Sequence, residues 1–376
     1  MKNPSEPHKL DQSVTKEINN WFKYPANRRD FIRGGVLAMA FSLGLLPRSS
    51  GKPVAGGLNS DTQSRALPKV RLGGTGASVS LLGIGAQILG ENVDGLDESN
   101  LEKTAIDVFN YAIDNGVNYF DAAAGYGRAE EFLGKTLKTN NNQRENLFLV
   151  SKVWTNSYHG AKQAFERTLK RLGTDYVDLL HLHDAGARDM DKALMLPSDA
   201  GYDPREHGAW KYLEEQKRAG RARFLGVTSH SGPKQFAHLI NHTNDPSNER
   251  EKVEATMVRF SYVSHTWDGF HRLVPPLVGK YNLGAMIMKV FGGPTGFGRD
   301  LNERELREAV RYALGYDWAH GCVIGCSSKE QVARNLEWIK SDPMTREEME
   351  VLRSLALSTN HIWKQRFAQR VAGRYC

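Results

Sequence analysis

The chain has 376 residues, of which 40% are hydrophobic and 25% are charged, a composition typical of a globular protein with one large core or two smaller ones. The formal net charge is +7, but residues 1–65 hold ten Lys and Arg against five Asp and Glu, which leaves 40 basic and 38 acidic residues in the rest. Because no basic stripe interleaved with aromatic residues occurs in that nearly neutral part, we expect no nucleic-acid partner.

Residues 1–67 have the features of an export signal followed by a linker. The stretch "NRRDFIRGG" places Arg28 and Arg29 before a weakly apolar run of 13 residues, 34–46. That run is shorter than the roughly 20 residues that span a bilayer. The order of features resembles signals of the twin-arginine type, which a dedicated export machinery reads. We therefore expect an exported protein, periplasmic or in the cell envelope, with anchoring by an uncleaved signal left open; an amphipathic helix with incidental arginines is the alternative.

Residues 68–376 are expected to form one domain in which strands and helices alternate. The stretch "VRLGGTGASVSLLGIGA" predicts a short N-terminal β-hairpin that turns at 73–76, then a first strand that ends at Gly85. An apolar stripe with helical spacing predicts the first helix over 101–113. Further strands are expected at 117–121, 146–152, 175–183, 222–229, 254–260, 284–289 and 322–325, and further helices at 129–138, 160–172, 209–219, 233–241, 270–280, 303–316 and 329–340.

Eight strands that are each followed by a helix favour the α/β class and a closed (β/α)8 TIM barrel. An open doubly wound sheet is the competing architecture. Such a sheet usually carries a G-x-G-x-x-G turn after its first strand, and "GIGAQILGEN" lacks that spacing. The barrel is therefore the prediction.

Four polar residues fall at or just beyond the C-terminal ends of the strands, where catalytic groups of such barrels lie. The second strand ends in Asp121, the third in Lys152 and the fourth in His183, and Tyr126 follows the second strand closely. A buried ammonium lowers the pKa of a neighbouring phenol, a carboxylate keeps that ammonium charged, and a neutral imidazole can orient a carbonyl. These four residues predict a proton-transfer site. His181 is expected to be a core histidine or one that supports the site residues, and no metal site is expected because no third ligand joins the two histidines.

Five motifs, in order, resemble segments of the aldo-keto reductase family. They are "VRLGGTGASVSLLGIG", "GVNYFDAAAGYG", "VSKVW", "DYVDLLHLH" and "GRARFLGVTSHSG", and the resemblance covers about residues 70–338. It implies Tyr126 as general acid/base, Lys152 and Asp121 as the pair that tunes it, and His183 as the carbonyl-orienting group. It also implies an oxidoreductase that uses NADP(H) or NAD(H) at the barrel mouth and interconverts a carbonyl and an alcohol by hydride transfer.

The resemblance also marks cofactor positions, and here the chain departs from the family pattern. Ser229 is kept where the family contacts the nicotinamide amide, but His230 and Arg259 replace the usual Asn and Gln. Met288 replaces a stacking aromatic residue, and Lys289 beside it adds a positive charge. NAD and NADP both stay open, because no basic residue occupies the usual 2′-phosphate position. The other expected contacts are Gly85, Gly325, Ser327, Gln331 and Asn335, with Lys329 or Arg334 as the partner of a 2′-phosphate.

The long segment after the fourth strand predicts a polar, aromatic-walled pocket for a small carbonyl compound, alcohol or sugar. Solvent-facing loops carry the same residue types. The expected substrate contacts are Trp154, Tyr158, His207 and Trp210.

Two other functions stay open. The cell envelope has no known supply of free nicotinamide nucleotide, so a cofactor loaded in the cytoplasm and retained through turnover would give a redox-neutral enzyme, for example one that acts on a sugar. The second open function is that of a non-catalytic barrel, which would bind a ligand or partner at the same mouth. The sequence makes no prediction of oligomeric state.

Overall fold

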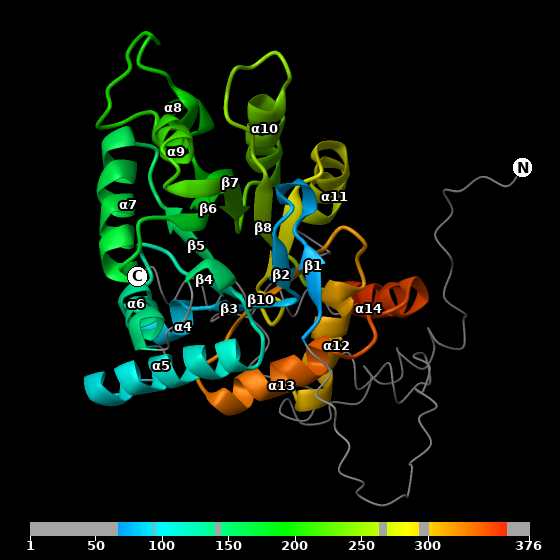
Figure 1. Ribbon diagram of the computed structural model, residues 1–376. Coiled ribbons are helices and arrows are strands. Elements are labelled where there is room, and N and C mark those ends of the chain that lie inside the picture. Colours follow the sequence, from blue (N-terminus) through cyan, green and yellow to red (C-terminus); the bar gives the residue numbers. More distant parts are fainter. Residues whose placement is uncertain (1–66, 93–94, 140–143, 263–268, 293–300, 359–376) are drawn as a thin grey trace, which may run out of the picture.

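The computed structural model describes residues 67–92, 95–139, 144–262, 269–292 and 301–358 (Figure 1). The predicted export signal lies outside the described residues, as does the end of the predicted domain, 359–376. None of the helices in the described ranges is both long and apolar enough to cross a membrane.

A closed barrel of eight parallel strands forms the centre of the protein. Each strand pairs with its neighbours in the chain, and β10 pairs with β3 to close the barrel. The prediction of a (β/α)8 TIM barrel is therefore confirmed. The strands are β3 (Leu82–Gly85), β4 (Tyr119–Asp121), β5 (Phe148–Val153), β6 (Val177–Leu182), β7 (Ala222–Ser229), β8 (Ala255–Arg259), β9 (Gly284–Met288) and β10 (Gly321–Gly325).

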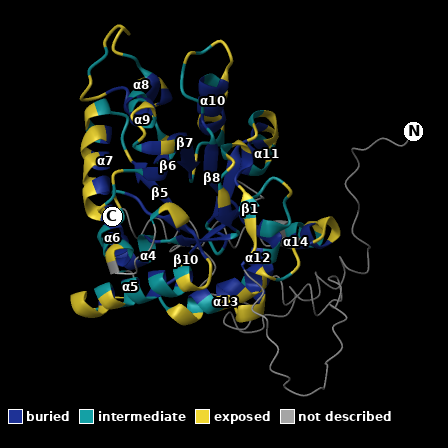
Figure 2. Ribbon diagram, in the orientation of Figure 1, coloured by how far each residue is buried: buried dark blue, intermediate teal, exposed yellow. Residues whose placement is uncertain are grey.

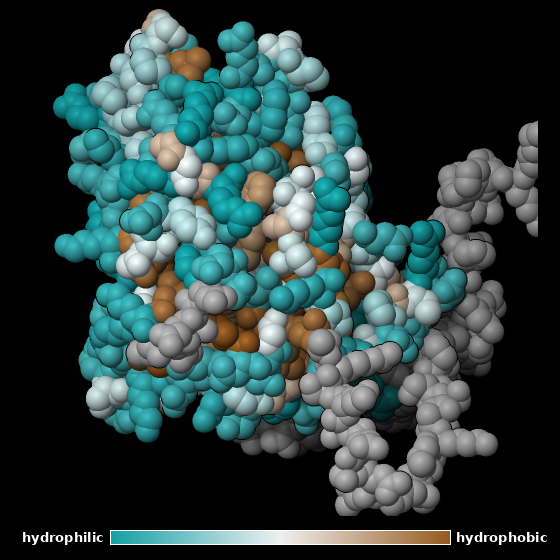
Figure 3. All heavy atoms as spheres, in the orientation of Figure 1, coloured by the Kyte–Doolittle hydropathy of each residue, from teal (hydrophilic) through white to brown (hydrophobic). Residues whose placement is uncertain are grey.

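Helices follow the strands and cover the outside of the barrel. The strands are buried and the helices expose one side each (Figure 2). On the face drawn in Figure 3, hydrophilic residues cover most of the outer helices and hydrophobic residues gather toward the middle. The covering helices are α5 (Glu98–Asp114), α6 (Ala129–Thr139), α7 (Tyr158–Leu172), α9 (Ala209–Arg218), α10 (Pro233–Asn244), α11 (Phe270–Tyr281), α12 (Glu303–Leu314) and α13 (Lys329–Ile339). Helices α4 (Gln87–Gly90), α8 (Met190–Leu194) and α14 (Arg346–Ser358) were not predicted.

The predicted hairpin is present and seals the N-terminal end of the barrel. Strands β1 (Lys69–Arg71) and β2 (Ser78–Ser80) are antiparallel. Leu72 and Val79, which flank the turn, are fully buried in one interior cluster with Tyr119 and Phe148 at the start of β4 and β5. Gly73 has a φ of 48°, and a Cβ there would lie 2.4 Å from the backbone just before β9. The hairpin thus packs closely against the barrel and leaves the C-terminal ends of the strands for a ligand.

Side chains inside the barrel change from apolar to polar toward the C-terminal ends of the strands. Every second residue of a strand faces inward, so Asp121 follows Tyr119 on the inner face of β4. Lys152, His181 and Gly226 are register partners on β5, β6 and β7. Lys152 is 1% exposed and His181 is fully buried. Charged and polar groups therefore gather in one layer beneath the barrel mouth.

Candidate active site

An ion pair lies inside the C-terminal end of the barrel. Asp121 is the last residue of β4, and the Lys152 Nζ lies 2.7 Å from its Oδ1 and 2.8 Å from its Oδ2. The same ammonium donates to the Ala122 carbonyl at 2.7 Å. Burial raises the pKa of Asp121 and lowers that of Lys152, while their mutual attraction opposes both shifts. The pair is thus held charged by close contact, away from the protein surface.

Tyr126 lies against this pair, in the turn between β4 and α6. The Lys152 Nζ lies 4.6 Å from the centroid of the tyrosine ring. The ring meets that of His183 edge to face, with centroids 5.7 Å apart. Gly127, with a φ of 52°, lets the turn approach α4, because a Cβ there would lie 2.1 Å from a backbone oxygen of that helix. The structure therefore brings the four predicted catalytic residues together.

The predicted lowering of the Tyr126 pKa is wrong for this structure. Burial raises that pKa well above its ordinary value, and negative charge on Asp121, Glu91 and Asp184 raises it further. Lys152 does not reverse the shift, because its ammonium bonds to Asp121 and contacts the tyrosine through the ring. Tyr126 is therefore a protonated phenol at neutral pH, poised to donate a proton.

The two histidines of β6 differ in position. His183, directly after β6, is bounded by the rings of Tyr126, Trp154 and His230, the last two at 6.2 Å. Burial and the charge of Lys152 lower its pKa well below the ordinary value, so its imidazole is neutral. His181 lies deeper and packs against Gly226 of the neighbouring strand β7, where an added Cβ would lie 2.5 Å from the His181 Nδ1. His181 therefore belongs to the core, one of the two roles predicted for it.

The loops after β6 and β7 are bonded to each other by Asp184, a residue not predicted from the sequence. Asp184 has a φ of 52°, and its Oδ1 accepts from the His230 N–H at 2.9 Å and from the Ser229 hydroxyl at 3.2 Å. The Ser229 Oγ also accepts from the Gly186 N–H at 3.0 Å and donates to the Ser231 carbonyl. Ser229 therefore bonds within the protein instead of facing a ligand. The one available signal was an Asp directly after His183 in "LHLHDAG".

A cavity of about 660 Å³ runs from the mouth of the barrel to helix α13. Its volume falls within the roughly 300–1,000 Å³ typical of small-molecule sites. Asp121 and Tyr126 line one end, and Trp338 lines the other. The predicted cofactor contacts that line it are Gly85, His230, Met288, Lys289, Gly325, Ser327, Gln331, Arg334 and Asn335. Those that do not are Ser229, Arg259 and Lys329. The lining residues not predicted from the sequence are mostly apolar: Ile88, Val290, Phe291, Leu306, Val323, Ile324 and Trp338, together with Gln87.

The charge that this cavity presents is positive. Lys289 has a φ of 59°, an uncommon conformation for a residue other than glycine, and burial together with Lys152 lowers its pKa. Burial, followed by the charge of Lys289, lowers the pKa of His230 to about 3, so this side chain is neutral. Its buried Nδ1 has no hydrogen-bond partner within the described residues. The site therefore offers an anionic ligand a cation and a vacant imidazole nitrogen.

At the far end, the start of α13 meets the cavity. Ser328 caps this helix by accepting from the Gln331 N–H at 3.3 Å, and the Gln331 Oε1 accepts from the Ser327 N–H at 2.9 Å. The Asn335 amide donates to the buried Cys326 Sγ at 3.1 Å. Arg334 also lines the cavity. A helix N-terminus and an arginine are both suited to hold phosphate.

Of the four predicted substrate contacts, the structure places one at the mouth. Trp154 is 67% exposed and lies beside His183. Tyr158 donates its hydroxyl to Glu215 of α9 and packs against that helix. The His207 Nδ1 accepts from a backbone N–H of its own loop. Trp210 is fully buried in α9. Tyr158, His207 and Trp210 therefore hold the long loop against α7 and α9, and the prediction that they bind substrate is not supported.

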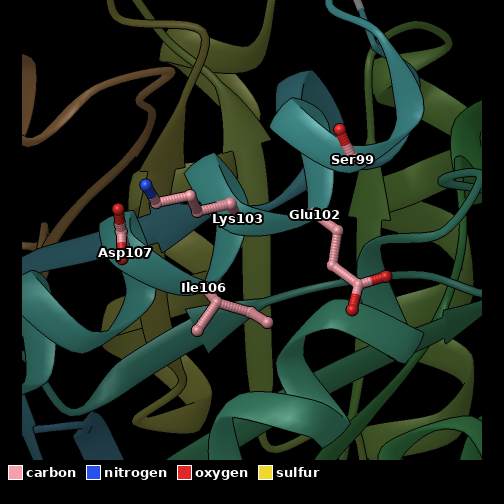
Figure 4. Close-up of a pocket in the computed structure, with 5 residues that line it drawn as sticks. All are labelled: Ser99, Glu102, Lys103, Ile106 and Asp107. Atoms are coloured by element: carbon pink, nitrogen blue, oxygen red, sulfur yellow. The ribbon is translucent and has the colours of Figure 1, made fainter.

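A second cavity, of about 490 Å³, has no link to these groups. Its five described lining residues, Ser99, Glu102, Lys103, Ile106 and Asp107, all lie on α5 (Figure 4). Glu102 pairs with Lys135 of α6 at 2.7 Å. Within the described part of the chain, no three His, Cys, Asp or Glu side chains are grouped to hold a metal ion.

Comparison with known proteins finds similar sequences among oxidoreductases. The chain is 30% identical over 165 residues to L-galactose dehydrogenase of Arabidopsis thaliana, which covers 42% of this chain and 47% of that protein. It is 28% identical over 182 residues to methylglyoxal reductase DkgA of Yersinia pestis, and that match covers 48% of this chain and 58% of that protein. These matches span about half the length of each relative.

Among solved structures, an aldo-keto reductase from Bacillus halodurans in its holo form superposes with a TM-score of 0.57 at 22% identity, over 77% of this chain and 96% of that one. This likeness concerns the fold. The model of the Aldo/keto reductase family matches residues 81–308, more than half of the chain. The chain therefore belongs to the aldo-keto reductase family.

Proposed function

We propose that this protein is an exported, NADP(H)- or NAD(H)-dependent oxidoreductase that interconverts a carbonyl and an alcohol. The single observation that carries the proposal is the assembly of Asp121, Lys152, Tyr126 and His183, of which Asp121 and Tyr126 line the 660 Å³ cavity. A proton donor, a neutral hydrogen-bonding imidazole and a ligand cavity meet at one place. Curated relatives named for a sugar and for a small ketoaldehyde support a small carbonyl compound, alcohol or sugar as substrate.

The residues of the cavity fit a nicotinamide nucleotide. Gly85 and Gly325, which are register partners, line the cavity without adding side chains to it. Lys289 and Arg334 supply positive charge for phosphate groups, and the unpartnered Nδ1 of His230 can bond a polar group of the ligand. Such a cofactor would supply or accept the hydride. Arg334 is the cavity residue best suited to a 2′-phosphate, which favours NADP.

The roles of the protein groups follow from their protonation. In reduction, the neutral His183 orients the substrate carbonyl, and the Tyr126 hydroxyl donates the proton that the new alcohol oxygen takes up. Asp121 holds Lys152 against the tyrosine ring, and this contact fixes the position of the proton donor. Oxidation runs these steps in reverse, with the phenolate as base.

A redox-neutral reaction with a retained cofactor is the second candidate. The leader that resembles a twin-arginine signal supports export to the periplasm or cell envelope, and His230 and Lys289 supply cavity groups that differ from the family pattern. A nucleotide loaded in the cytoplasm would then be oxidised and reduced in place.

Replacing the proposed acid tests catalysis against simple binding. We expect Tyr126→Phe to lower kcat/KM for aldehyde reduction by roughly a hundred- to ten-thousandfold, because the proton donor is removed and the ring remains. Nucleotide affinity, measured by fluorescence titration, should stay within about threefold of wild type. Tyr281→Phe, on the surface helix α11, is the matched control. Full activity of Tyr126→Phe would contradict the assignment, and a barrel that binds ligand without turnover in the wild type would favour the non-catalytic alternative.

The raised pKa of Tyr126 predicts different pH dependences for reduction and oxidation. Because the phenol stays protonated, kcat/KM for reduction should be flat from about pH 6 to pH 9. Oxidation needs the phenolate, whose fraction grows tenfold per pH unit below the pKa, so its rate should rise throughout that range without a plateau. His183 contributes no inflection there, since its pKa is lowered. Initial rates in constant-ionic-strength buffers check this; a plateau of the oxidation rate near pH 7 would refute it.

Cofactor retention has a direct test. We expect full-length protein purified by gel filtration to release close to one equivalent of NADP or NAD on denaturation, identified by mass spectrometry. Lys289→Met should lower this occupancy, because a cavity cation is lost. Protein that carries no nucleotide and turns over fully with added NADPH would exclude the retained-cofactor mechanism and leave the oxidoreductase proposal standing.

A further inference from the structure

One arginine at the barrel mouth has no ion pair within the described residues. Arg188 follows the short turn 185–187 after β6, and its Nε donates to the His183 carbonyl at 3.2 Å. Its guanidinium carbon lies 5.0 Å from the centroid of the Trp154 ring. The same tryptophan ring lies 6.2 Å from the ring of His183. Arg188 and Trp154 therefore both lie next to His183.

Arg188 differs in this respect from two other partly buried arginines, Arg144 and Arg311. Arg144 pairs with Asp178 at 2.8 Å, and Arg311 pairs with Glu348 at 3.1 Å. The acidic residue that acts on Arg188, Asp184, directs its Oδ1 to the loop after β7 instead. Burial lowers the pKa of Arg188, and Asp184 opposes that shift. A cation removed from part of its water without a carboxylate partner is unfavourable, and a bound anion would relieve this.

We propose that Arg188 binds a carboxylate of the substrate, so that the enzyme acts on oxo acids and their hydroxy-acid counterparts. The inference rests on the proposed carbonyl–alcohol chemistry and names its substrate class. The Nε is already bonded to the His183 backbone, which leaves the two terminal nitrogens to form a forked pair with a carboxylate. Because that Nε bond ties Arg188 to His183, the anion site and the carbonyl-orienting group are fixed relative to each other.

The local backbone also makes this geometry rigid. Gly186 lies two residues before Arg188, and a Cβ there would come 1.8 Å from the Ser231 carbonyl oxygen, so the turn is packed against the loop after β7. The Asp184 bonds to that loop lock the same turn. The backbone at Arg188 is therefore held in place, and its guanidinium group loses little conformational entropy when it binds an anion.

Paired aldehydes test the proposal. The probes are glyoxylate against glycolaldehyde and succinic semialdehyde against butanal, each pair differing chiefly by a carboxylate, with NADPH and NADH as reductants. Wild-type protein should prefer the carboxylated member of at least one pair by tenfold or more in kcat/KM. Arg188→Met should lower that preference roughly ten- to a hundredfold, mainly through KM, because the charged hydrogen bonds are lost. The preference of Arg188→Lys should lie between those of wild type and Arg188→Met, since lysine keeps the positive charge but cannot form the paired hydrogen bonds of a guanidinium group.

Arg205→Met is the matched control, because Arg205 is an exposed arginine paired with Asp203, and it should leave the preference unchanged. If both members of each pair are turned over, and wild type and Arg188→Met show an equal preference, Arg188 is not the carboxylate anchor, and the oxidoreductase function stays intact.

A binding experiment covers the case in which no aldehyde is turned over. It is a calorimetric titration with oxalate at constant ionic strength. We expect saturable binding that weakens at least tenfold in Arg188→Met; absent or unchanged binding overturns the proposal, whereas oxalate binding without aldehyde turnover supports the anchor and contradicts the proposed catalysis.

Discussion

The ion pair of Asp121 and Lys152 is the interaction on which the site depends. Each charge would be costly to bury alone, and the pair is tolerated because neighbouring strands bring the two groups to contact distance. Asp121 is the register partner of Val150, so Lys152 lies one inward-facing position further along β5. The ammonium is thereby pressed against the ring of Tyr126, which places the proton donor.

The rest of the fold gives this pair its surroundings. The hairpin fills the N-terminal end of the barrel with apolar side chains, so water and ligand reach the pair from the other end. Burial in turn keeps His183 neutral and Tyr126 protonated, the forms that reduction of a carbonyl needs. The positive charge left over at the mouth, on Lys289 and Arg188, suits anionic ligands.

The fold and the clustering of the four site residues could be predicted, because the fold follows from periodicity and the clustering from the positions of strand ends. Alternating strands and helices imply a parallel barrel, and in such a barrel Asp121, Lys152 and His183 share one end. Which of the predicted substrate contacts lie at the barrel mouth could not be predicted in this way. Trp210 is as aromatic as Trp154, and only tertiary packing decides that one is buried in α9 and the other exposed at the mouth. Loop geometry likewise decides that Ser229, an expected cofactor contact, accepts a hydrogen bond from the Gly186 N–H within the protein.

The most direct test of this dependence is a double-mutant cycle on the pair. Asp121→Asn, Lys152→Met and the double variant are compared by kcat/KM for aldehyde reduction, with folding checked by circular dichroism. If the two residues act as one unit, the double variant should be about as slow as the slower single variant, with a coupling of roughly 1–3 kcal/mol. Losses that simply add would show that Asp121 and Lys152 act independently, and would contradict the dependence of the site on their ion pair.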